Sequence, residues 1–521
     1  VAPLYEAPEF GMAEKMVIKA MALAFIKSVD EVTALYKKSG DLGETAEKLS
    51  SQEDSIARST RSRMTVEEVF KSLKSLTEIT GEGSVDKKVE VLANLLQGCH
   101  PCSARFIARI PVDKMRLGFS DMTVLEGLSW MIDGTKKHKD RIEAAYNVRP
   151  DLGFIAKAVK ENRLENIGPK VGTPILGMRA ERLTNAADIL EKMNGRCAVE
   201  PKLDGLRTQL HFSKNKVKLY SRGLEDVTAM YPDLVMAALK ELDCDEVILD
   251  GEALGYDPQT QRFLPFQETV TRKRKYDVDL KSQSVPLRLV VFDCLYYNWQ
   301  NLINKTYHQR MEIIEGLLKN GRNIVCAEMT EVDSPQKLEN FFKNCLKRGF
   351  EGIMAKILDG IYQAGARGWN WIKLKKSYES KIADTIDAVV MGYDFGQGKR
   401  NKFGIGAFLI GVYDKKSDSY KTVSKVGTGL TDLEWKELVT RTQSLVTSQK
   451  QGNYDVNKLM NCDVWISPKI VGEFKADELT KSPMHTAGFA LRFPRLEKWR
   501  TDKKPEDTTN LQEILELANL K

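Results

Sequence analysis

Residues 200–207 read Glu200-Pro201-Lys202-Leu203-Asp204-Gly205-Leu206-Arg207, and both the predicted fold and the predicted chemistry start from this segment. Its pattern, Lys-x-Asp-Gly-x-Arg, fixes four letters, so chance produces it in about one 500-residue chain in 300. Lys202 follows a run of strand-forming residues, and Asp204-Gly205 is a typical turn. A lysine amine attacks phosphorus only when unprotonated, a state that desolvation or a neighbouring cation such as Arg207 favours. Lys202 is therefore the candidate nucleophile, and the alternative is an ordinary charge at a strand end.

The residues around this stretch alternate between strand and helix patterns. Four strands are predicted, at Cys197–Leu210, Val217–Ser221, Glu246–Leu254 and Leu287–Tyr296. Two helices are predicted between and after them, at Tyr231–Leu242 and Thr306–Leu318. Strands that alternate with helices in this way are typical of a mixed α/β domain, here of about 200 residues.

The pattern of apolar and glycine residues changes at two places, and these changes divide the 521 residues into three predicted domains. Upstream of the α/β region, apolar residues recur at helical spacing, as in Val17–Leu35, Val66–Ile79 and Val85–Leu96. A Gly/Pro-rich segment at 166–174 then suits a boundary, and beyond Tyr378 short strands with glycine-rich turns indicate a small barrel. We therefore predict a helical domain at 1–167, an α/β domain at 168–378 and a β-barrel domain at 379–521.

The composition excludes several classes of protein. Apolar residues make up 42% and charged residues 29%, which excludes a disordered or collagen-like chain. The eight cysteines are scattered, with a single CxxC at Cys99–Cys102, and predict reduced thiols inside a cell. Apolar runs such as Met16–Ile26 are shorter than a membrane span, and no signal peptide is predicted. The net charge of +7 permits contact with a polyanion, although solvated faces explain the basic clusters better from charge alone.

Four further elements carry acids and cations that suit phosphate chemistry. Asp250-Gly251-Glu252 and Phe292-Asp293 each close a predicted strand, and Glu351-Gly-Ile-Met-Ala-Lys356 joins an acid to a base. In Trp371-Ile-Lys-Leu-Lys375 the alternation places both lysines on one strand face. Taken singly, each element is more often a turn acid or a core aromatic. Together they supply a nucleophile, carboxylates for a metal, a stacking aromatic and fixed cations.

This order of motifs resembles that of the ATP-dependent DNA ligases. After Lys202-x-Asp-Gly-x-Arg207 come Ser221-Arg222-Gly223, the four elements above, and finally Arg492-Phe-Pro-Arg495 and Arg500-x-Asp-Lys503. Near the N-terminus, Gly40-Asp41-Leu42-Gly43 and Met115–Phe119 look like the DNA-binding domain of the archaeal and eukaryotic replicative type. The resemblance covers nearly the whole chain. It implies an all-α DNA-binding domain, an α/β nucleotidyltransferase domain and a β-barrel of the OB-fold type.

The resemblance implies ATP-dependent sealing of 5′-phosphate/3′-hydroxyl nicks in duplex DNA, in replication, repair and recombination. Lys202 would attack the α-phosphorus of ATP, AMP would pass to the 5′-phosphate, and the 3′-hydroxyl would then expel AMP. The resemblance gives the remaining roles as follows: Glu252 and Glu351 for Mg²⁺ or Mn²⁺, Glu200 and Phe292 for adenine, Lys373 and Lys375 for the α-phosphate, Arg207, Arg222 and Arg367 for nucleotide or nick phosphates, Arg492 and Lys503 for pyrophosphate, and Lys114 and Arg116 for DNA.

Other functions are weighed against this one. An RNA ligase or another nucleotidyltransferase shares the Lys-x-Asp-Gly pattern, but such enzymes usually lack a helical N-terminal domain. An NAD-dependent ligase would carry a zinc-type cysteine cluster, and an inert scaffold would not keep the lysine and acids intact. We expect a monomer that acts on nicked DNA in the cytoplasm or nucleoid, or in the nucleus of a eukaryote, with no membrane partner. Recruitment by a sliding clamp is left open, because the sequence contains no convincing clamp-binding peptide.

Overall fold

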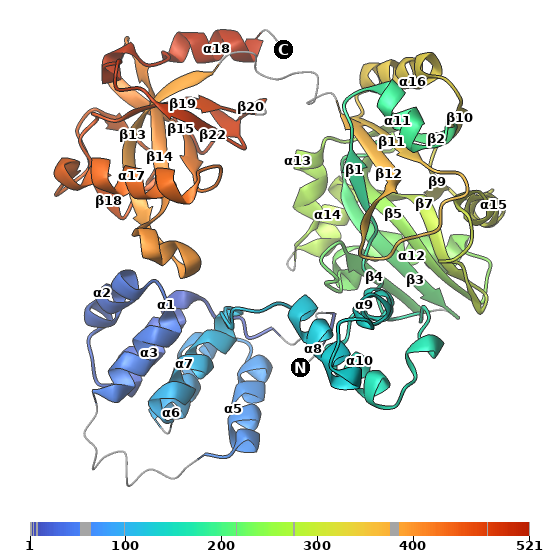
Figure 1. The fold of residues 1–521 in the computed structure, drawn as a ribbon, viewed down its shortest axis with the longest axis horizontal. Helices are drawn as coiled ribbons and strands as arrows, with labels where there is room; N and C mark the ends of the chain where they lie inside the picture. Colours follow the sequence, from blue (N-terminus) through green and yellow to red (C-terminus); the bar gives the residue numbers. More distant parts are fainter. Residues whose placement is uncertain are drawn as a thin grey trace. The chain divides into compact units, whose positions relative to one another are not determined.

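The structure is a computed structural model, and it describes every residue except 1, 2, 4, 7, 8, 53–63, 98, 215, 275, 276, 376–384, 477, 520 and 521. The predicted boundary at 378/379 lies outside the described residues. The chain divides into two compact units, one of residues 1–7 and 119–379 and one of residues 8–118 and 380–521 (Figure 1). The helical region predicted over 1–167 is thus shared between the two units.

Two sheets form the core of the unit that contains Lys202 (Figure 1). The smaller sheet has the strand order β1 (Arg179–Arg182), β12 (Arg367–Lys375), β11 (Gly352–Lys356), β2 (Cys197–Pro201), β10 (Thr330–Val332). The larger has the order β4 (Lys216–Ser221), β3 (Leu206–Ser213), β5 (Glu246–Asp257), β7 (Leu287–Tyr297), β8 (Gln300–Asn301), with β6 (Arg262–Phe263) on β5 and β9 (Ile324–Cys326) on β7. Most of these strand pairs are antiparallel, whereas β1 runs parallel to β12 and β9 runs parallel to β7.

Helices cover the outer face of each sheet. On the larger sheet, α12 (Pro232–Glu241) and α15 (Tyr307–Leu317) bury apolar side chains such as Leu234 and Ile314, which confirms both predicted helices. On the smaller sheet, α11 (Ala186–Lys192) and α16 (Pro335–Lys347) do the same. Met178, Ile248 and Trp371 fill the space between the two sheets. Burial of this kind supplies most of the driving force for the fold.

The single strand predicted at Cys197–Leu210 is wrong. The segment forms β2 in the smaller sheet and β3 in the larger one, and residues 202–205 join them. Gly205 lies so close to β5 that a Cβ there would come within 2.5 Å of the Ala253 carbonyl oxygen. The chain therefore turns at a residue that only glycine can fill, and Lys202 is carried at the crossover between the sheets.

A buried ion pair joins β7 to α15. Arg310 Nε donates to Asp293 Oδ1 at 2.6 Å, and both side chains are 0% exposed. Removing one partner of such a pair leaves a buried charge uncompensated. We therefore expect Arg310→Met to lower the free energy of unfolding by about 3–5 kcal/mol in urea titrations followed by tryptophan fluorescence. The exposed Arg322→Met is the control, and a loss at Arg310 below about 1 kcal/mol would contradict the assignment.

Three further helices of this unit form an apolar cluster of their own. They are α8 (Asp121–Asp133), α9 (Lys139–Val148) and α10 (Leu152–Lys160), and they pack around Leu125, Ile142 and Ile155. The Asn147 carbonyl oxygen on α9 accepts a hydrogen bond from the Leu176 amide at 2.9 Å. This contact ties the helices to the segment that precedes β1.

Residues 8–118 of the second unit form a helical bundle. Its helices are α1 (Glu14–Ala24), α2 (Val29–Ser39), α3 (Leu42–Ser51), α5 (Val66–Glu78), α6 (Ser84–Gln97) and α7 (Pro101–Arg109). The run predicted at Val17–Leu35 breaks into α1 and α2, because Ser28 and Glu31 form a capping box that starts a new helix. In the Gly40–Gly43 motif, Gly40 ends α2 with φ +64, and Asp41 caps α3 while binding Arg109.

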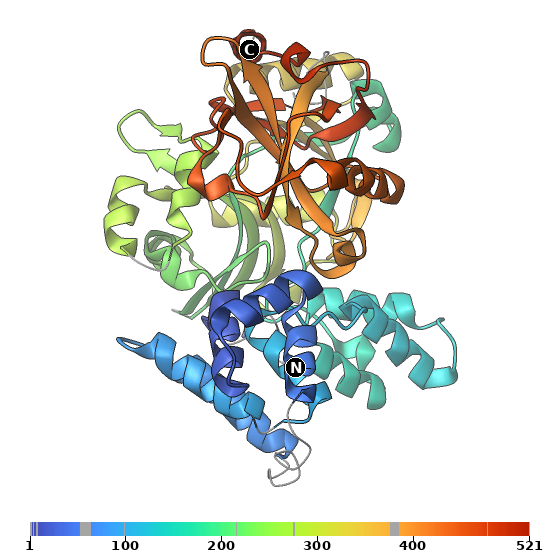
Figure 2. The same cartoon turned by 90° about the vertical axis from the view of Figure 1, so that its left-hand side faces the viewer.

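Residues 380–521 contain curled sheets consistent with an OB-fold (Figure 2). At their centre β13 (Ile386–Phe395) pairs with β14 (Ile405–Asp414), β18 (Val464–Ile466) and β19 (Val471–Lys475), while β15 (Ser419–Val426) lies beyond β14. Pro468 lies between β18 and β19 and separates the two strands. Two helices not predicted, α17 (Asp432–Thr442) and α18 (Leu511–Asn519), cover this core. Across the described residues, no helix has both the length and the apolar character that crossing a membrane requires.

Candidate active site

Lys202 lies in a pocket of about 320 Å³ between the two sheets. The backbone of the lysine is fixed, because its amide donates to the Gly352 carbonyl at 2.8 Å and its carbonyl accepts from the Glu351 amide at 3.3 Å. Its side chain is 19% exposed, and Nζ contacts the Glu351 carboxylate. The amine therefore reaches the pocket from a rigid backbone and next to a carboxylate.

The pocket brings together every residue that the sequence predicted for the nucleotide or the metal in this unit. They are Glu200, Lys202, Arg207, Arg222, Glu252, Phe292, Glu351, Arg367, Lys373 and Lys375. Several further residues complete the lining, among them Met178, Arg179, Met354, Lys356 and Trp371. Of these, Met354, Lys356 and Trp371 stand inside predicted motifs, whereas no motif marks Met178 or Arg179.

One end of the pocket combines a buried carboxylate with an aromatic wall. Lys356 Nζ donates to Glu200 Oε1 at 2.7 Å and to the Phe292 carbonyl oxygen at 2.9 Å, and the Tyr307 hydroxyl also donates to Glu200 Oε1. Burial raises the pKa of Glu200, although Lys356 opposes the shift. Phe292 packs edge-on against Trp371, with ring centroids 5.8 Å apart. This end suits a flat heterocycle that carries hydrogen-bond donors.

The other end of the pocket concentrates positive charge. Burial, followed by the charges of Lys375 and Lys202, lowers the pKa of Lys373. The carboxylate of Glu351 contacts both Lys202 and Lys375. Burial alone would raise the pKa of Glu351, but these two lysines outweigh it and hold that pKa below its usual value. Cations packed this closely repel one another, so an anion between them would be stabilised.

Two carboxylates from different sheets face the same pocket. Glu252 on β5 accepts a hydrogen bond from the Gly205 amide at 3.2 Å, and Glu351 precedes β11. Burial raises the pKa of Glu252 to about 7, against the pull of Lys202 and Arg207. Among the described residues, no group of three or more acids, histidines or cysteines converges on a metal site. The pair therefore fits Mg²⁺, which proteins often hold with one or two carboxylates while water and substrate phosphates supply the rest.

Arg207 is already engaged within the protein. Its guanidinium donates to both oxygens of Asp250, at 3.1 and 2.7 Å, and to the Met178 carbonyl oxygen at 2.6 Å. The Tyr362 hydroxyl also donates to Asp250, at 2.7 Å. Neither partner could be predicted from the sequence, because Asp250 and Tyr362 are both distant from Arg207 along the chain. Asp250 thus neutralises most of the charge that Arg207 brings to the pocket wall.

The remaining predicted residues lie in the other unit. Lys114 is exposed and pairs with Glu14, whereas Arg116 donates to the Gly40 carbonyl at 2.7 Å and to Asp41 at 2.8 Å. Arg116 thus supports the turn between α2 and α3. On the barrel, Arg492 Nε donates to the hydroxyl of Thr480 at 3.1 Å. Lys503 Nζ contacts the carboxylate of Asp387, which also binds Arg500.

Comparisons with known proteins agree on one family. Models described as ATP dependent DNA ligase domain, DNA ligase N terminus and ATP dependent DNA ligase C terminal region match residues 177–375, 1–129 and 401–503. A protein of Dictyoglomus turgidum named probable DNA ligase is 43% identical over 528 residues, covering 99% of this chain and 89% of the relative. A DNA ligase of Saccharolobus solfataricus is 38% identical over 532 residues, covering 98% and 88%.

The likeness extends to a solved structure titled Pmar-Lig_PreS3. It covers 94% of this chain and 99% of that one, with a TM-score of 0.54 at 17% identity, and so shows a shared fold. The matched segment 177–375 also contains the entire lining of the lysine pocket, from Met178 to Lys375. The motifs, the fold and the full-length relatives together show that this chain belongs to the ATP-dependent DNA ligases.

Proposed function

We propose that this chain seals nicks in duplex DNA with ATP, through an AMP carried on Lys202. The observation that carries the proposal is that one pocket brings the Lys202 amine together with two carboxylates and a cluster of cations. A lysine can form a phosphoramidate when cations neutralise the attacked phosphate and the amine is aligned with it. The rigid backbone at residues 202–205 supports that alignment.

In the first step the Lys202 amine attacks the α-phosphorus of ATP and pyrophosphate leaves. Lys373 and Lys375 neutralise the negative charge that develops on the phosphate oxygens, since both point from β12 into the pocket. Phe292 lies along one face of adenine, and the Glu200 carboxylate accepts a hydrogen bond from the amino group of adenine. Glu252 and Glu351 would hold Mg²⁺, or Mn²⁺ in its place, which when bound neutralises further phosphate charge.

The two later steps use the same pocket. AMP moves from Lys202 to the 5′-phosphate of the nick, and the 3′-hydroxyl then attacks that phosphate and releases AMP. The first of these transfers takes place at the phosphorus of AMP and the second at the phosphorus of the 5′-phosphate, with AMP as the leaving group. The two phosphates are joined when the second transfer begins, so the same cations, with Arg222 and Arg367, serve again. The helical residues toward the N-terminus supply further affinity for DNA. Each of the two predicted cations there is paired with an acid, and Lys114 is the stronger candidate for a phosphate contact because 43% of its side chain is exposed, against 23% for Arg116.

Replacing Phe292 by alanine is expected to weaken the use of ATP more than the binding of DNA. Stacking of a base on an aromatic ring contributes about 1–3 kcal/mol, so the ATP concentration for half-maximal adenylylation should rise about tenfold or more. Titration of ATP in single-turnover adenylylation measures this effect, and thermal melting of the same variant tests its folding. A variant that melts early yet keeps the normal ATP dependence would show that Phe292 is only a core residue.

The experiment that tests the proposed function follows label from ATP to product. The chain is incubated with α-labelled ATP and Mg²⁺, and then with a duplex containing a 5′-phosphate/3′-hydroxyl nick in DNA or in RNA. We expect labelled protein, then labelled AMP and a joined DNA strand, with little joining of RNA. Joining of RNA in preference to DNA would support the alternative function, and absence of labelled protein would contradict both.

A further inference from the structure

Three buried side chains meet where aromatic rings line the lysine pocket. They are Glu200 on β2, Lys356 on β11 and Tyr307 at the start of α15, with exposed fractions of 3%, 1% and 1%. Glu200 and Lys356 line the pocket, whereas Tyr307 belongs to the apolar core beside the larger sheet. The reaction steps proposed above use Glu200 but give Tyr307 no role.

Both buried donors bind the same oxygen of the Glu200 carboxylate. Lys356 Nζ donates to Oε1 at 2.7 Å, and the Tyr307 hydroxyl also donates to Oε1. Within the part of the chain that the structure describes, no donor binds Oε2 of Glu200. The protein therefore occupies one oxygen of this carboxylate and leaves the other one for a ligand.

The two donors are themselves fixed in place. Burial, followed by the charge of Glu200, raises the pKa of Tyr307 well above its usual value, so the hydroxyl keeps its proton and donates. Lys356 is enclosed by three rings, because its Nζ lies 4.7, 4.8 and 4.9 Å from the ring centroids of Trp371, Tyr307 and Phe292. The carboxylate of Glu200 is thus held by two donors that cannot turn away from it.

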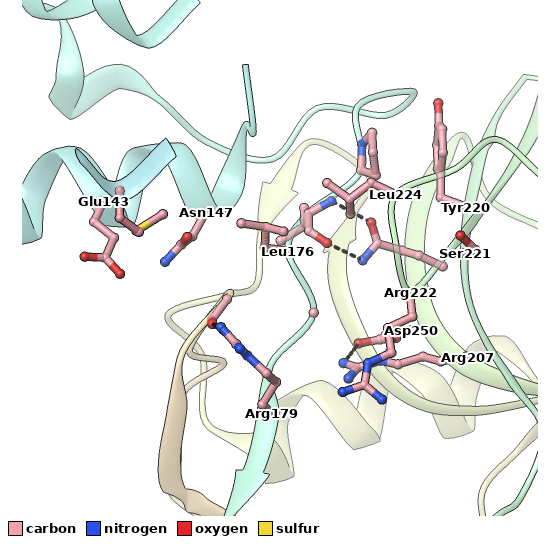
Figure 3. Close-up of a pocket in the computed structure, with 16 residues that line it drawn as sticks. Glu143, Asn147, Leu176, Arg179, Arg207, Tyr220, Ser221, Arg222, Leu224 and Asp250 are labelled. Carbon is pink, nitrogen blue, oxygen red and sulfur yellow. Dashed lines mark hydrogen bonds and ion pairs between the residues drawn. The ribbon is translucent and has the colours of Figure 1, made fainter. Parts of the chain in front are cut away.

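The aromatic wall beside this carboxylate is fixed from its other side. The Arg207 guanidinium lies 5.6 Å from the ring centroids of Phe292 and Trp371. Asp250 binds that guanidinium, and Figure 3 shows the two side chains together. A base that stacks on Phe292 therefore meets a carboxylate whose orientation is set before the base arrives.

A fixed carboxylate oxygen distinguishes purines by the group at position 6. Adenine carries an amino group there, which donates, whereas guanine and hypoxanthine carry an oxygen, which accepts. The Glu200 carboxylate is paired with Lys356 and has no proton to donate, so Oε2 only accepts. It binds the amino group and repels the oxygen, and a buried polar group left unpaired makes such discrimination strong.

We propose that Tyr307 is a positioning residue for the choice of nucleotide. Its hydroxyl holds Oε1 of Glu200 and thereby presents Oε2 to the 6-amino group of adenine, which disfavours triphosphates of 6-oxo purines. Tyr307 acts through Glu200 and touches neither ATP nor the reacting atoms. The proposal rests on the proposed function, because it requires the pocket to bind a purine nucleotide for transfer to Lys202.

The decisive variant is Tyr307→Phe, measured with three α-labelled nucleotides that differ at position 6. They are ATP, the triphosphate of purine riboside, which has only hydrogen there, and ITP, which has an oxygen. The apparent second-order rate constant for labelling of the protein by ATP should fall about tenfold, because a hydrogen bond to a charged group is lost. The rate constant for purine riboside triphosphate should change by less than about threefold. The preference for ATP over either analogue should therefore fall.

This readout separates positioning from stability. The preference is a ratio measured on one preparation, so an unfolded fraction of the variant cancels from it. Tyr231→Phe is the matched control, since Tyr231 is also 1% exposed in the same core and its hydroxyl bonds no described residue. This control should alter neither the rate constants nor the preference.

Two results would overturn the proposal. Equal losses with ATP and with purine riboside triphosphate would make Tyr307 a core residue only. An unchanged rate constant with ATP would show that Glu200 is oriented without the hydroxyl. Failure of the proposed function is distinguishable, because the unmodified chain would then form no labelled protein with any of the three nucleotides.

Discussion

The Lys202→Ala variant is expected to form no covalent AMP, a loss of at least about 10⁴-fold in adenylylation. The reason is geometric, since Lys202 is the pocket lysine that the crossover between the two sheets carries. Lys356 is buried against Glu200 and the Phe292 carbonyl, and Lys373 and Lys375 sit on the far strand, β12. Transfer of label from α-labelled ATP, resolved on a denaturing gel, measures the effect.

The same variant should still act on a nick that already carries 5′-AMP. The last step needs the 3′-hydroxyl and the surrounding cations but no lysine nucleophile, so its rate should fall by less than about tenfold. Lys240→Ala, an exposed lysine on α12, is the control and should keep both activities. A Lys202→Ala protein that still carries labelled AMP would overturn the assignment.

The second large effect is expected at Arg492 and Lys503 on the barrel. Each single alanine variant should slow adenylylation about 100-fold or more, because these cations would stabilise pyrophosphate, which leaves only in the first step. Sealing of a pre-adenylylated nick should change by less than about threefold. Both residues belong to the unit that does not contain Lys202, so we propose that the barrel contacts the pocket during the first step and leaves it for the later ones.

Single-turnover rates of both steps, on the same preparations, decide this prediction. The exposed Lys498→Ala is the matched control. Unchanged rates in both steps would show that Arg492 and Lys503 are surface charges. Equal losses in both steps would mean that they bind DNA, and either result would contradict the proposed contact.

The sequence predicted the pocket well because each motif is local. Lys202 and Gly205, and likewise Lys373 and Lys375, owe their positions to a turn or to the alternation of one strand. A short pattern is enough to place such residues on one edge of a sheet. The predicted fold class, with a helical region, an α/β core and a barrel, is confirmed for the same reason, since helical and strand periodicities are local properties.

What the sequence could not predict depends on tertiary contacts. No sequence neighbour of Arg207 indicates that Asp250 forms an ion pair with it. No sequence neighbour of Tyr307 indicates that its hydroxyl donates to Glu200. The sequence indicates a turn at Asp204-Gly205, yet strand-forming residues continue on both sides of it. Only the structure shows that the strands before and after this turn, β2 and β3, join different sheets.

Peptide mapping by mass spectrometry tests whether AMP is carried on Lys202. The chain is incubated with ATP and Mg²⁺, quenched under conditions that preserve phosphoramidates, digested and analysed by mass spectrometry. The account predicts that the peptide containing Lys202 gains the mass of one AMP, and that this mass is lost when nicked DNA is added, after removal of free ATP, before quenching. AMP on any other residue, or a Lys202 peptide that never gains it, would contradict the account.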